Sequence, residues 1–436
     1  MTTATLTATP VRTLGLRSQL GLWGNLGISL LLPVAATYIV LSGQSLLATL
    51  LAVVVGAVIG STLLGLAAAA GARTGAPAMV LMRGLLGTRL SSLPTAANLV
   101  QCVGWATFEI FVIAEVATQL TDGPRWVFVL VGGVLATVMA LHPLGVVHLL
   151  ARYAVWAAVA STAYLLVQVL REPLPGLTDG DFGGFWLSVD LVIALPVSWV
   201  PLAADYARHS RSATASFLGA SVGYGTATIL FFALGVLAVK VYGVTGFDVV
   251  AQLLLLPVAV VAVLILVLDE LDEAFANLYS TAVSAQNLRP GWDRRHLVLG
   301  VGALATVLAL TVDATGYEPF LFLLGAVFVP LTATFLVAYY LLARRSRTGW
   351  DVSAGAPARW EMLLPWAVGF VAYQLVAPTA LTGWAQGWTS WWTARQADVG
   401  LSGSGWSASL VSLAVAGGLT VAVGLVSQRV RRTVRA

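Results

Sequence analysis

The sequence is poor in charge, cysteine and histidine. Only 10% of its 436 residues are charged, whereas roughly 25% is usual in a soluble domain, and 58% are hydrophobic. So few charges cannot coat a water-soluble globule of this size, which excludes a soluble enzyme, a disordered chain and a DNA-binding domain. The single cysteine, Cys102, excludes an intramolecular disulfide and a cysteine zinc site. The sequence also lacks a phosphate-cradling glycine loop and a nucleophile–histidine pair, which argues against an ATP-driven pump and a membrane hydrolase.

Long apolar runs fill most of the chain. A helix needs about 20 mostly apolar residues to cross the hydrocarbon of a bilayer. The sequence predicts an all-α polytopic membrane protein with twelve spans, at roughly 21–42, 46–70, 93–119, 126–143, 148–170, 186–204, 218–241, 253–287, 296–313, 318–342, 362–382 and 406–427. The eighth run is too long for one upright helix, so we expect a tilt or a surface turn near Gln252. The first run lacks a small-residue cleavage site, which favours a membrane helix over a signal peptide.

The basic residues indicate which way the spans run. Twelve spans place both termini on one side of the membrane, and of the 23 lysines and arginines all but Arg125, Arg171, Lys240 and Arg395 fall on that side. Because basic residues are retained in the cytoplasm, we expect both termini to be cytoplasmic.

The spans divide the chain into five expected parts. These are a cytoplasmic tail (1–20), a ten-helix transport core (21–342), a cytoplasmic linker (343–361), two peripheral spans (362–427) and a basic cytoplasmic tail (428–436). We interpret the tail cluster Arg429–Arg435 as a topology anchor, with a lipid- or nucleic-acid-binding patch as the alternative. The segment 75–90 is too short and too charged to span, so we expect an amphipathic helix on the cytoplasmic surface.

Two spans carry signals of a broken helix. The first contains Gly24, Asn25, Gly27 and Pro33, and the sixth contains Pro196, Ser198, Trp199 and Pro201. A break at membrane depth is tolerated only where it faces protein or a water-filled cavity. The two lie five spans apart, as expected if spans one to five and six to ten are inverted repeats that meet at a midplane binding site. Ordinary glycine packing and proline kinks are the alternative.

The third span is unusually polar. It carries Asn98, Gln101, Trp105, Glu109 and Glu115. Trp105 and Glu109 are four residues apart and share one helix face, where an aromatic ring and a carboxylate would suit a flat heterocycle. Alternatively, Trp105 packs within the bundle and Glu109 pairs internally.

The eighth span is the most polar of all. It holds Asp269, Glu270, Asp272, Glu273, Asn277, Ser280, Thr281, Ser284 and Gln286. Such residues must face a cavity, a counter-charge or a bound cation, because ionisable groups are costly in lipid. The neutral hydroxyls of Ser280 and Thr281 suit a hard cation such as sodium, although back-bonding to the previous turn is a common alternative.

These stretches resemble a known family. "LWGNLGIS", "GARTGAPAMVLMRGLLGTRLSSLP", "GWATFE", "SWVPLAADYARHSR" and "DELDEAFANLYSTAVSAQN" are similar to the bacterial nucleobase–cation symporters, the family of cytosine permease and the allantoin and hydantoin transporters. The last stretch is most similar to permeases proposed for hydroxymethylpyrimidine, a thiamine precursor. The resemblance implies a LeuT-like ten-helix inverted-repeat core with broken helices one and six, and two peripheral helices.

The resemblance also implies roles for particular residues. Trp105 would stack on the heterocycle, Glu109 would bind it one turn later, and Trp199 would be a second aromatic contact. Asn277 and Gln286 would contact the edge of the ring. The extra acids Asp272 and Glu273 depart from the common pattern of cytosine permeases, and Asp272 could accept hydrogen bonds from an amino-pyrimidine. Asn25 and Ser198, beside the predicted breaks, are further candidates for the substrate site. The coupling cation, Na⁺ or H⁺, would bind the helix-one region that includes Gly24, Gly27 and Ile28, together with Ser280 and Thr281.

The sequence therefore predicts a secondary active importer of a pyrimidine-like heterocycle, such as cytosine or hydroxymethylpyrimidine, in the bacterial cytoplasmic (inner) membrane. Its expected partners are a small heterocycle, a monovalent cation and the lipid bilayer, without nucleic acid, an organic cofactor or enzymatic activity. The alternatives are a symporter of another solute on the same fold (a purine, allantoin, a hydantoin or an amino acid), and a channel or receptor.

Overall fold

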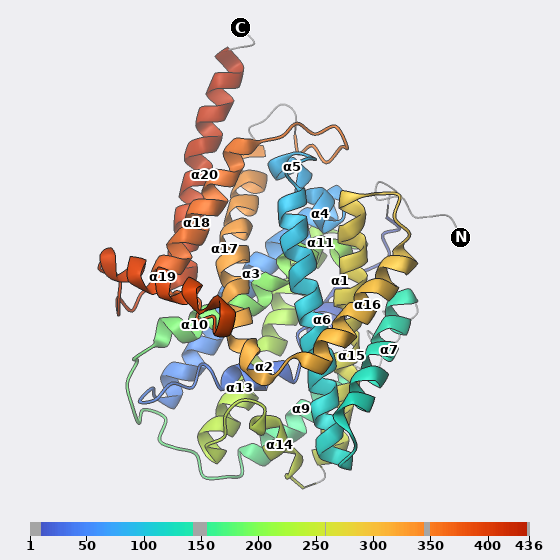
Figure 1. The fold of residues 1–436 in the computed structure, drawn as a ribbon, viewed down its shortest axis with the longest axis vertical. Helices are drawn as coiled ribbons and strands as arrows, with labels where there is room; N and C mark the ends of the chain where they lie inside the picture. Colours follow the sequence, from blue (N-terminus) through green and yellow to red (C-terminus); the bar gives the residue numbers. More distant parts are fainter. Residues whose placement is uncertain (1–9, 143–154, 258, 344–348, 434–436) are drawn as a thin grey trace.

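A computed structural model describes residues 10–142, 155–257, 259–343 and 349–433, and this part of the chain is mostly helical (Figure 1). Within the described residues, seven helical stretches are long and apolar enough to cross a membrane: Leu46–Thr74, Ser92–Thr121, Phe185–Ala207, Ala213–Tyr242, Arg294–Thr311, Tyr317–Leu342 and Ala408–Ser427. They show a polytopic membrane protein. The count of twelve spans and the inverted repeat stay predictions.

The first predicted break is confirmed. Helix α1 (Leu16–Asn25) ends at the residue after Gly24, and five residues separate it from α2 (Leu31–Ala36). An added Cβ at Gly27 would lie 3.0 Å from the carbonyl oxygen of Tyr224, so this residue is held close to a neighbouring backbone. The break is buried within the bundle, as unpaired backbone at this depth requires.

The sixth span is interrupted much less than predicted. α10 (Phe185–Ser198) and α11 (Val200–Ala207) are separated only by Trp199, which keeps helical angles of φ −81° and ψ −13°. Its N–H donates to the carbonyl of Pro196 at 3.2 Å, a three-residue step in place of the usual four. Pro201 lacks an N–H, which accounts for a local kink without an unwound segment.

The centre of the bundle is a pair of long helices. α6 (Ser92–Thr121) packs along α15 (Ala259–Leu288), and beside them α3 (Leu46–Thr74) packs against α10. Small residues let the second pair approach, since an added Cβ at Gly56 would lie 2.8 Å from the carbonyl oxygen of Val189. The polar faces of α6 and α15 therefore meet each other inside the protein.

The remaining helices cover this centre. On one side lie α7 (Arg125–Leu141), α9 (Val155–Val169), α16 (Arg294–Thr311), and the run of α12 (Ala213–Leu218), the π-helical turn η2 (Gly219–Tyr224) and α13 (Gly225–Tyr242). α17 (Tyr317–Val337), continued by the π-helical turn η4 (Ala338–Leu342), packs against α10, and α18 (Leu363–Val376), α19 (Gln386–Asp398) and α20 (Ala408–Thr433) form the opposite flank (Figure 1).

Asp190 of α10 attaches that flank to the core. It accepts hydrogen bonds from the backbone N–H of Ala408 at 2.7 Å and Ser409 at 3.0 Å, and from the Ser407 hydroxyl at 2.5 Å. A carboxylate from another helix thus caps the start of α20.

Three boundary predictions have different outcomes. The prediction that the segment 75–90 forms one amphipathic surface helix was wrong. The segment forms two single-turn helices, α4 (Ala78–Leu81) and α5 (Arg83–Leu86), and both are buried. The expected turn near Gln252 is confirmed, because α14 (Asp248–Leu254) precedes α15 as a separate helix. Residues 148–154 of the fifth predicted span and the end of the basic tail at Arg435 lie outside the described residues.

Candidate functional site

The break in the first helix is held by one acid of α15. The backbone N–H of Leu30 donates to Oε1 of Glu270, and the Ser29 hydroxyl donates to Oε2 at 3.2 Å. Ser29 Oγ in turn accepts from the N–H of Leu31 at 3.1 Å. Backbone groups freed by the break are thus satisfied by a carboxylate and a hydroxyl, as buried polar groups require. The conformation of the break depends on this acid.

A second acid of α15 contacts the end of α1. The side-chain amide of Asn25 donates a hydrogen bond to Asp272. One turn earlier, Asp269 is 2% exposed, and neither of its carboxylate oxygens has a hydrogen-bond partner among the described residues. All four acids of this turn are buried, so the prediction that none faces lipid is confirmed.

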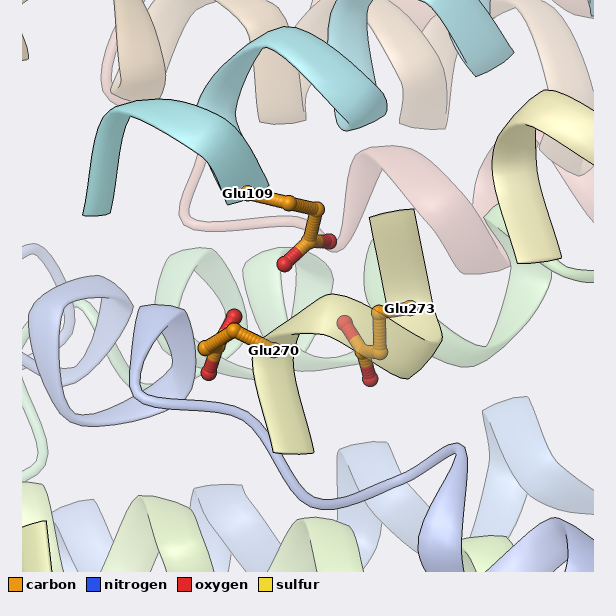
Figure 2. Close-up of side chains that lie close together, drawn as sticks. All are labelled: Glu109, Glu270 and Glu273. Carbon is orange, nitrogen blue, oxygen red and sulfur yellow. The ribbon is translucent and has the colours of Figure 1, made fainter. Parts of the chain in front are cut away.

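Three glutamates meet where α6 crosses the acidic turn of α15. Glu109 of α6 and Glu270 and Glu273 of α15 each place a carboxylate oxygen within 4.8 Å of the others. Figure 2 shows the Glu109 carboxylate pointing from α6 toward the turn that carries the other two. Glu109 is fully buried and neither of its oxygens has a partner among the described residues. These oxygens are the strongest candidates in the described structure to bind a positive charge or a donor-rich ligand.

Trp105 lies one turn before Glu109, in an aromatic wall. Its ring centroid is 5.3 Å from that of Phe320 and 6.2 Å from that of Tyr317, both on α17 and both edge-to-face. The indole nitrogen is buried and has no acceptor among the described residues. The Tyr317 hydroxyl donates to the carbonyl of Leu31 at 3.3 Å, so this wall also contacts α2. An unpartnered donor and two unpartnered acceptors therefore lie one turn apart on α6.

Trp199 belongs to a second aromatic group. It lies 6.4 Å from Trp23 of α1 and 6.1 Å from Tyr224 of η2, centroid to centroid. The neighbouring carbonyl of Ser198 accepts from the Gln101 side chain at 2.8 Å, which joins the α10–α11 junction to α6. The Ser198 hydroxyl donates to the carbonyl of Leu195 at 2.7 Å. The junction is therefore tied to α6 one turn from Trp105, but the two tryptophans lie in different ring groups.

Lower on α15, the predicted residues separate. The Asn277 amide donates to the carbonyl of Glu273 at 3.1 Å, and Asn277 stays buried near the glutamates. Thr281 donates to the carbonyl of Asn277 at 2.7 Å, which is the back-bonding alternative. Gln286 donates to the carbonyl of Trp292 at 3.0 Å, beyond the end of the helix. At about 1.5 Å per residue it lies roughly 20 Å along α15 from Glu273, so it is not brought to the glutamates.

Among the described residues, no hydrogen bond joins the predicted cation residues of the first helix to Ser280 or Thr281. Ser280 donates to the Tyr206 hydroxyl at 3.4 Å, and the break that follows Gly24 is bonded instead to Glu270 and Asp272. Ser280 lies eight residues after Asp272, about 12 Å along the helix. Gly27 and Ile28 are buried in the break itself. The hydroxyl-based cation site stays a prediction.

We refer to the buried polar region around Trp105, Glu109, Glu270 and Glu273 as the chamber, and a polar contact lies at each end of it. At one end, Nε of Arg83 in α5 donates to Oδ1 of Asn287 at 2.8 Å, and the Asn287 amide donates to Thr95 of α6 at 3.0 Å. At the other, Arg125 forms an ion pair with Glu115 at 2.5 Å and donates to the carbonyl of Ala309 at 3.0 Å. The glutamates and both tryptophans are buried between these contacts, so the structure is closed on both sides.

Some of these residues were not found from the sequence. Ser29, Arg83 and Asn287 lie in stretches that carry the family resemblance but were given no role, and Tyr317 lies outside them. Each acts through a partner more than 190 residues away, which the sequence does not show. Glu270 was named without a role, since it lies off the face shared by Asp269, Asp272 and Glu273. The sequence therefore does not indicate that Glu270 contacts the break in the first helix. Only the packing of α15 between α6 and the break shows it.

The fold matches solved membrane transporters. The chain aligns with Mhp1, a nucleobase–cation-symport-1 family transporter, in a closed conformation with bromovinylhydantoin bound, with a TM-score of 0.72 and 17% identity over 96% of this chain and 99% of that one. The inward-facing conformation of Mhp1 gives a TM-score of 0.70 and 17% identity, covering 97% of both chains. The chain therefore shares its overall fold with these proteins.

The sequence comparison identifies the family. The profile of permeases for cytosine/purines, uracil, thiamine and allantoin matches residues 11–351. The cytosine permease of Escherichia coli (strain K12) is 26% identical over 317 residues, which cover 69% of this chain and 72% of the relative. The cytosine permease of Escherichia coli O157:H7 gives the same values. The chain belongs to this permease family and is a membrane transporter, not an enzyme.

Proposed function

We propose that the protein imports a pyrimidine-like heterocycle, cytosine or hydroxymethylpyrimidine, by cation-coupled symport across the bacterial cytoplasmic (inner) membrane. The proposal includes twelve spans, a ten-helix inverted-repeat core and two cytoplasmic termini. One observation carries it: Glu109 is fully buried with two unpartnered carboxylate oxygens, one helical turn from the unpartnered indole N–H of Trp105. Unmet hydrogen-bonding capacity in a closed chamber suits a ligand that supplies both donors and an acceptor.

The ligand would be bound by its face and by its edge. Trp105 stacks on the ring, and Glu109 accepts hydrogen bonds from ring N–H or exocyclic amino groups. Asp272, Asn25 and Asn277 surround the same level of α15 and contact other parts of the edge. Trp199 with Ser198 covers the ligand from the α10–α11 junction. Gln286 has no part in this arrangement, because it is bonded at the far end of the helix.

Transport requires the chamber to open to one side at a time. The closed structure has a polar contact at each end, Arg83 with Asn287 and Arg125 with Glu115. In the proposed cycle, ligand and cation enter past Arg125, the break of the first helix orders around them, and both leave past Arg83. Sodium or a proton is the coupling ion. For sodium, Ser280 and Thr281 with the helix-one carbonyls near Gly24 are the candidate ligands.

Counterflow in proteoliposomes tests the substrate. Vesicles of purified protein are loaded with unlabelled cytosine, hydroxymethylpyrimidine, uracil, hypoxanthine, allantoin or leucine, and entry of labelled cytosine is measured at equal ion concentrations on both sides. We expect cytosine and hydroxymethylpyrimidine to drive entry and leucine to give none. Counterflow by leucine alone would support the amino-acid alternative. Entry that never exceeds simple equilibration, whatever the internal solute, would indicate a channel or receptor.

A further inference from the structure

We propose that Glu109 and the acidic turn of α15 (Asp269, Glu270, Asp272 and Glu273) form a proton-binding site, and that the proton is the coupling ion. The claim that the proton drives uptake rests on the proposed function. The presence of bound protons is a separate, directly measurable property of the cluster.

The site is more than a run of acids on one helix. Glu109 comes from α6, is fully buried, lacks a partner on either oxygen, and points into the acidic turn (Figure 2). Its carboxylate lies within 4.8 Å of both Glu270 and Glu273. None of these three forms an ion pair within the described part of the chain. Their charge is therefore not compensated by a basic side chain.

Three buried carboxylates in this space cannot all be ionised without a compensating positive charge. Like charges at such separation repel strongly where water is excluded, and each ion loses its hydration. A proton on Glu109 removes one charge and adds a donor, which completes a hydrogen bond to a neighbouring carboxylate. Glu109 then has one O–H donor for that hydrogen bond and keeps its other oxygen as an acceptor for the ligand.

The surroundings favour a proton over a metal ion. Both oxygens of Glu270 already accept hydrogen bonds, from the N–H of Leu30 and the hydroxyl of Ser29. Donors pointed at a carboxylate stabilise it as an anion and keep a cation away, whereas sodium and calcium are bound by oxygen lone pairs.

Other titratable groups around the cluster agree with this assignment. Tyr317 from α17 is close enough to interact electrostatically with all three glutamates, and Tyr224 from η2 with Glu109 and Glu273. On α15 itself the neighbours are Asp269 and Asp272. Two phenols and two further acids supply proton donors and acceptors but no fixed positive charge.

The cluster can couple proton movement to the break in the first helix. Glu270 contacts both Glu109 and the N–H of Leu30, so a proton that joins the glutamates holds α6, α15 and the break together. When the proton leaves, repulsion among the carboxylates loosens that connection. In each cycle one proton would pass from external water to a carboxylate and then to internal water, with only O–H bonds forming and breaking.

Infrared spectroscopy tests the bound proton without any substrate. A protonated buried carboxylic acid has a C=O stretch that shifts in D₂O and is absent from a carboxylate. We expect this band in wild-type protein at neutral pH, its loss or displacement in Glu109→Gln and Glu273→Gln, and its retention in Glu115→Gln, an acid of the same helix paired with Arg125. A spectrum without such a band, or a band that disappears when sodium or calcium chloride is added, would overturn the assignment.

Gradient-driven uptake tests the coupling. In sodium-free proteoliposomes with an acidic exterior we expect cytosine to accumulate, and a sodium gradient at equal pH to drive none. Glu270→Gln and Glu273→Gln should reduce accumulation by at least about tenfold while counterflow falls far less. Accumulation driven by sodium alone would refute proton coupling. Absence of wild-type counterflow would instead refute the proposed substrate, and the infrared result would stand independently.

Discussion

Asn25, the last residue of α1, donates a hydrogen bond to Asp272 on α15, and both side chains are buried. The two residues are 247 positions apart in the sequence. Their contact joins the end of the interrupted helix to the acidic turn that faces Glu109. The Asn25 amide donates to a carboxylate that forms no ion pair among the described residues.

Removal of that amide should destabilise the closed state. Asn25→Ala leaves Asp272 buried without its donor, and we expect a loss of about 1–3 kcal/mol in the free energy of unfolding. Thermal unfolding in detergent measures it, with Asp272→Ala and the double variant completing a cycle. If the hydrogen bond matters, the double variant loses less than the sum of the single ones. Strict additivity would show that the two side chains do not interact.

The contact of Arg83 with Asn287 should keep the chamber closed at the α5 end. Arg83→Ala removes the donor to Asn287, so we expect that end to open more often. The buried thiol of Cys102 on α6 reports this directly, because it is the single cysteine of the chain. Labelling by a small maleimide should become at least about tenfold faster, a shift of about 1.4 kcal/mol in the closed-state equilibrium.

A matched control separates opening from general loosening. Arg395→Ala removes an exposed ion pair with Asp398 on α19, far from the chamber in the fold, and should leave the labelling rate of Cys102 unchanged. Equal labelling of wild type and Arg83→Ala would mean that Arg83 does not hold the chamber shut.

The hydroxyls of Ser280 and Thr281 should not set the ion dependence. In the structure the Thr281 hydroxyl donates to its own helix and the Ser280 hydroxyl donates to Tyr206, and neither is bonded to the break. We expect the double variant Ser280→Ala, Thr281→Ala to show the same dependence of cytosine uptake on external sodium and pH as the wild type. A shift in the sodium concentration for half-maximal uptake would restore the hydroxyl-based sodium site.

The sequence was informative where charged, polar or helix-breaking residues stand in long apolar runs. Acids and a tryptophan in apolar runs predicted that the polar residues of the third and eighth spans face the interior of the protein, and glycine, asparagine and proline predicted a break in the first span. Both follow from local composition, because lipid does not tolerate such groups.

The sequence could not supply contacts set by packing between distant segments. Four acids within five residues look equivalent in the sequence, yet Glu270 binds the break, Asp272 binds Asn25 and Glu273 faces Glu109. Ser280 and Thr281 fit the chemistry of a cation site but lie more than two turns from the acids that contact the break. For the same reason the segment 75–90 was expected on the surface, although tertiary contacts such as that of Arg83 bury it.

The pocket itself is the central claim, and Trp105 offers the most direct measurement. Equilibrium binding of labelled cytosine to purified protein is compared for wild type, Trp105→Phe and Trp105→Ala, with Trp391→Ala on the exposed α19 as the control. We predict that Trp105→Ala weakens binding by more than about tenfold, that Trp105→Phe retains most of the affinity, and that the control binds as wild type. Wild-type affinity in Trp105→Ala would contradict the account.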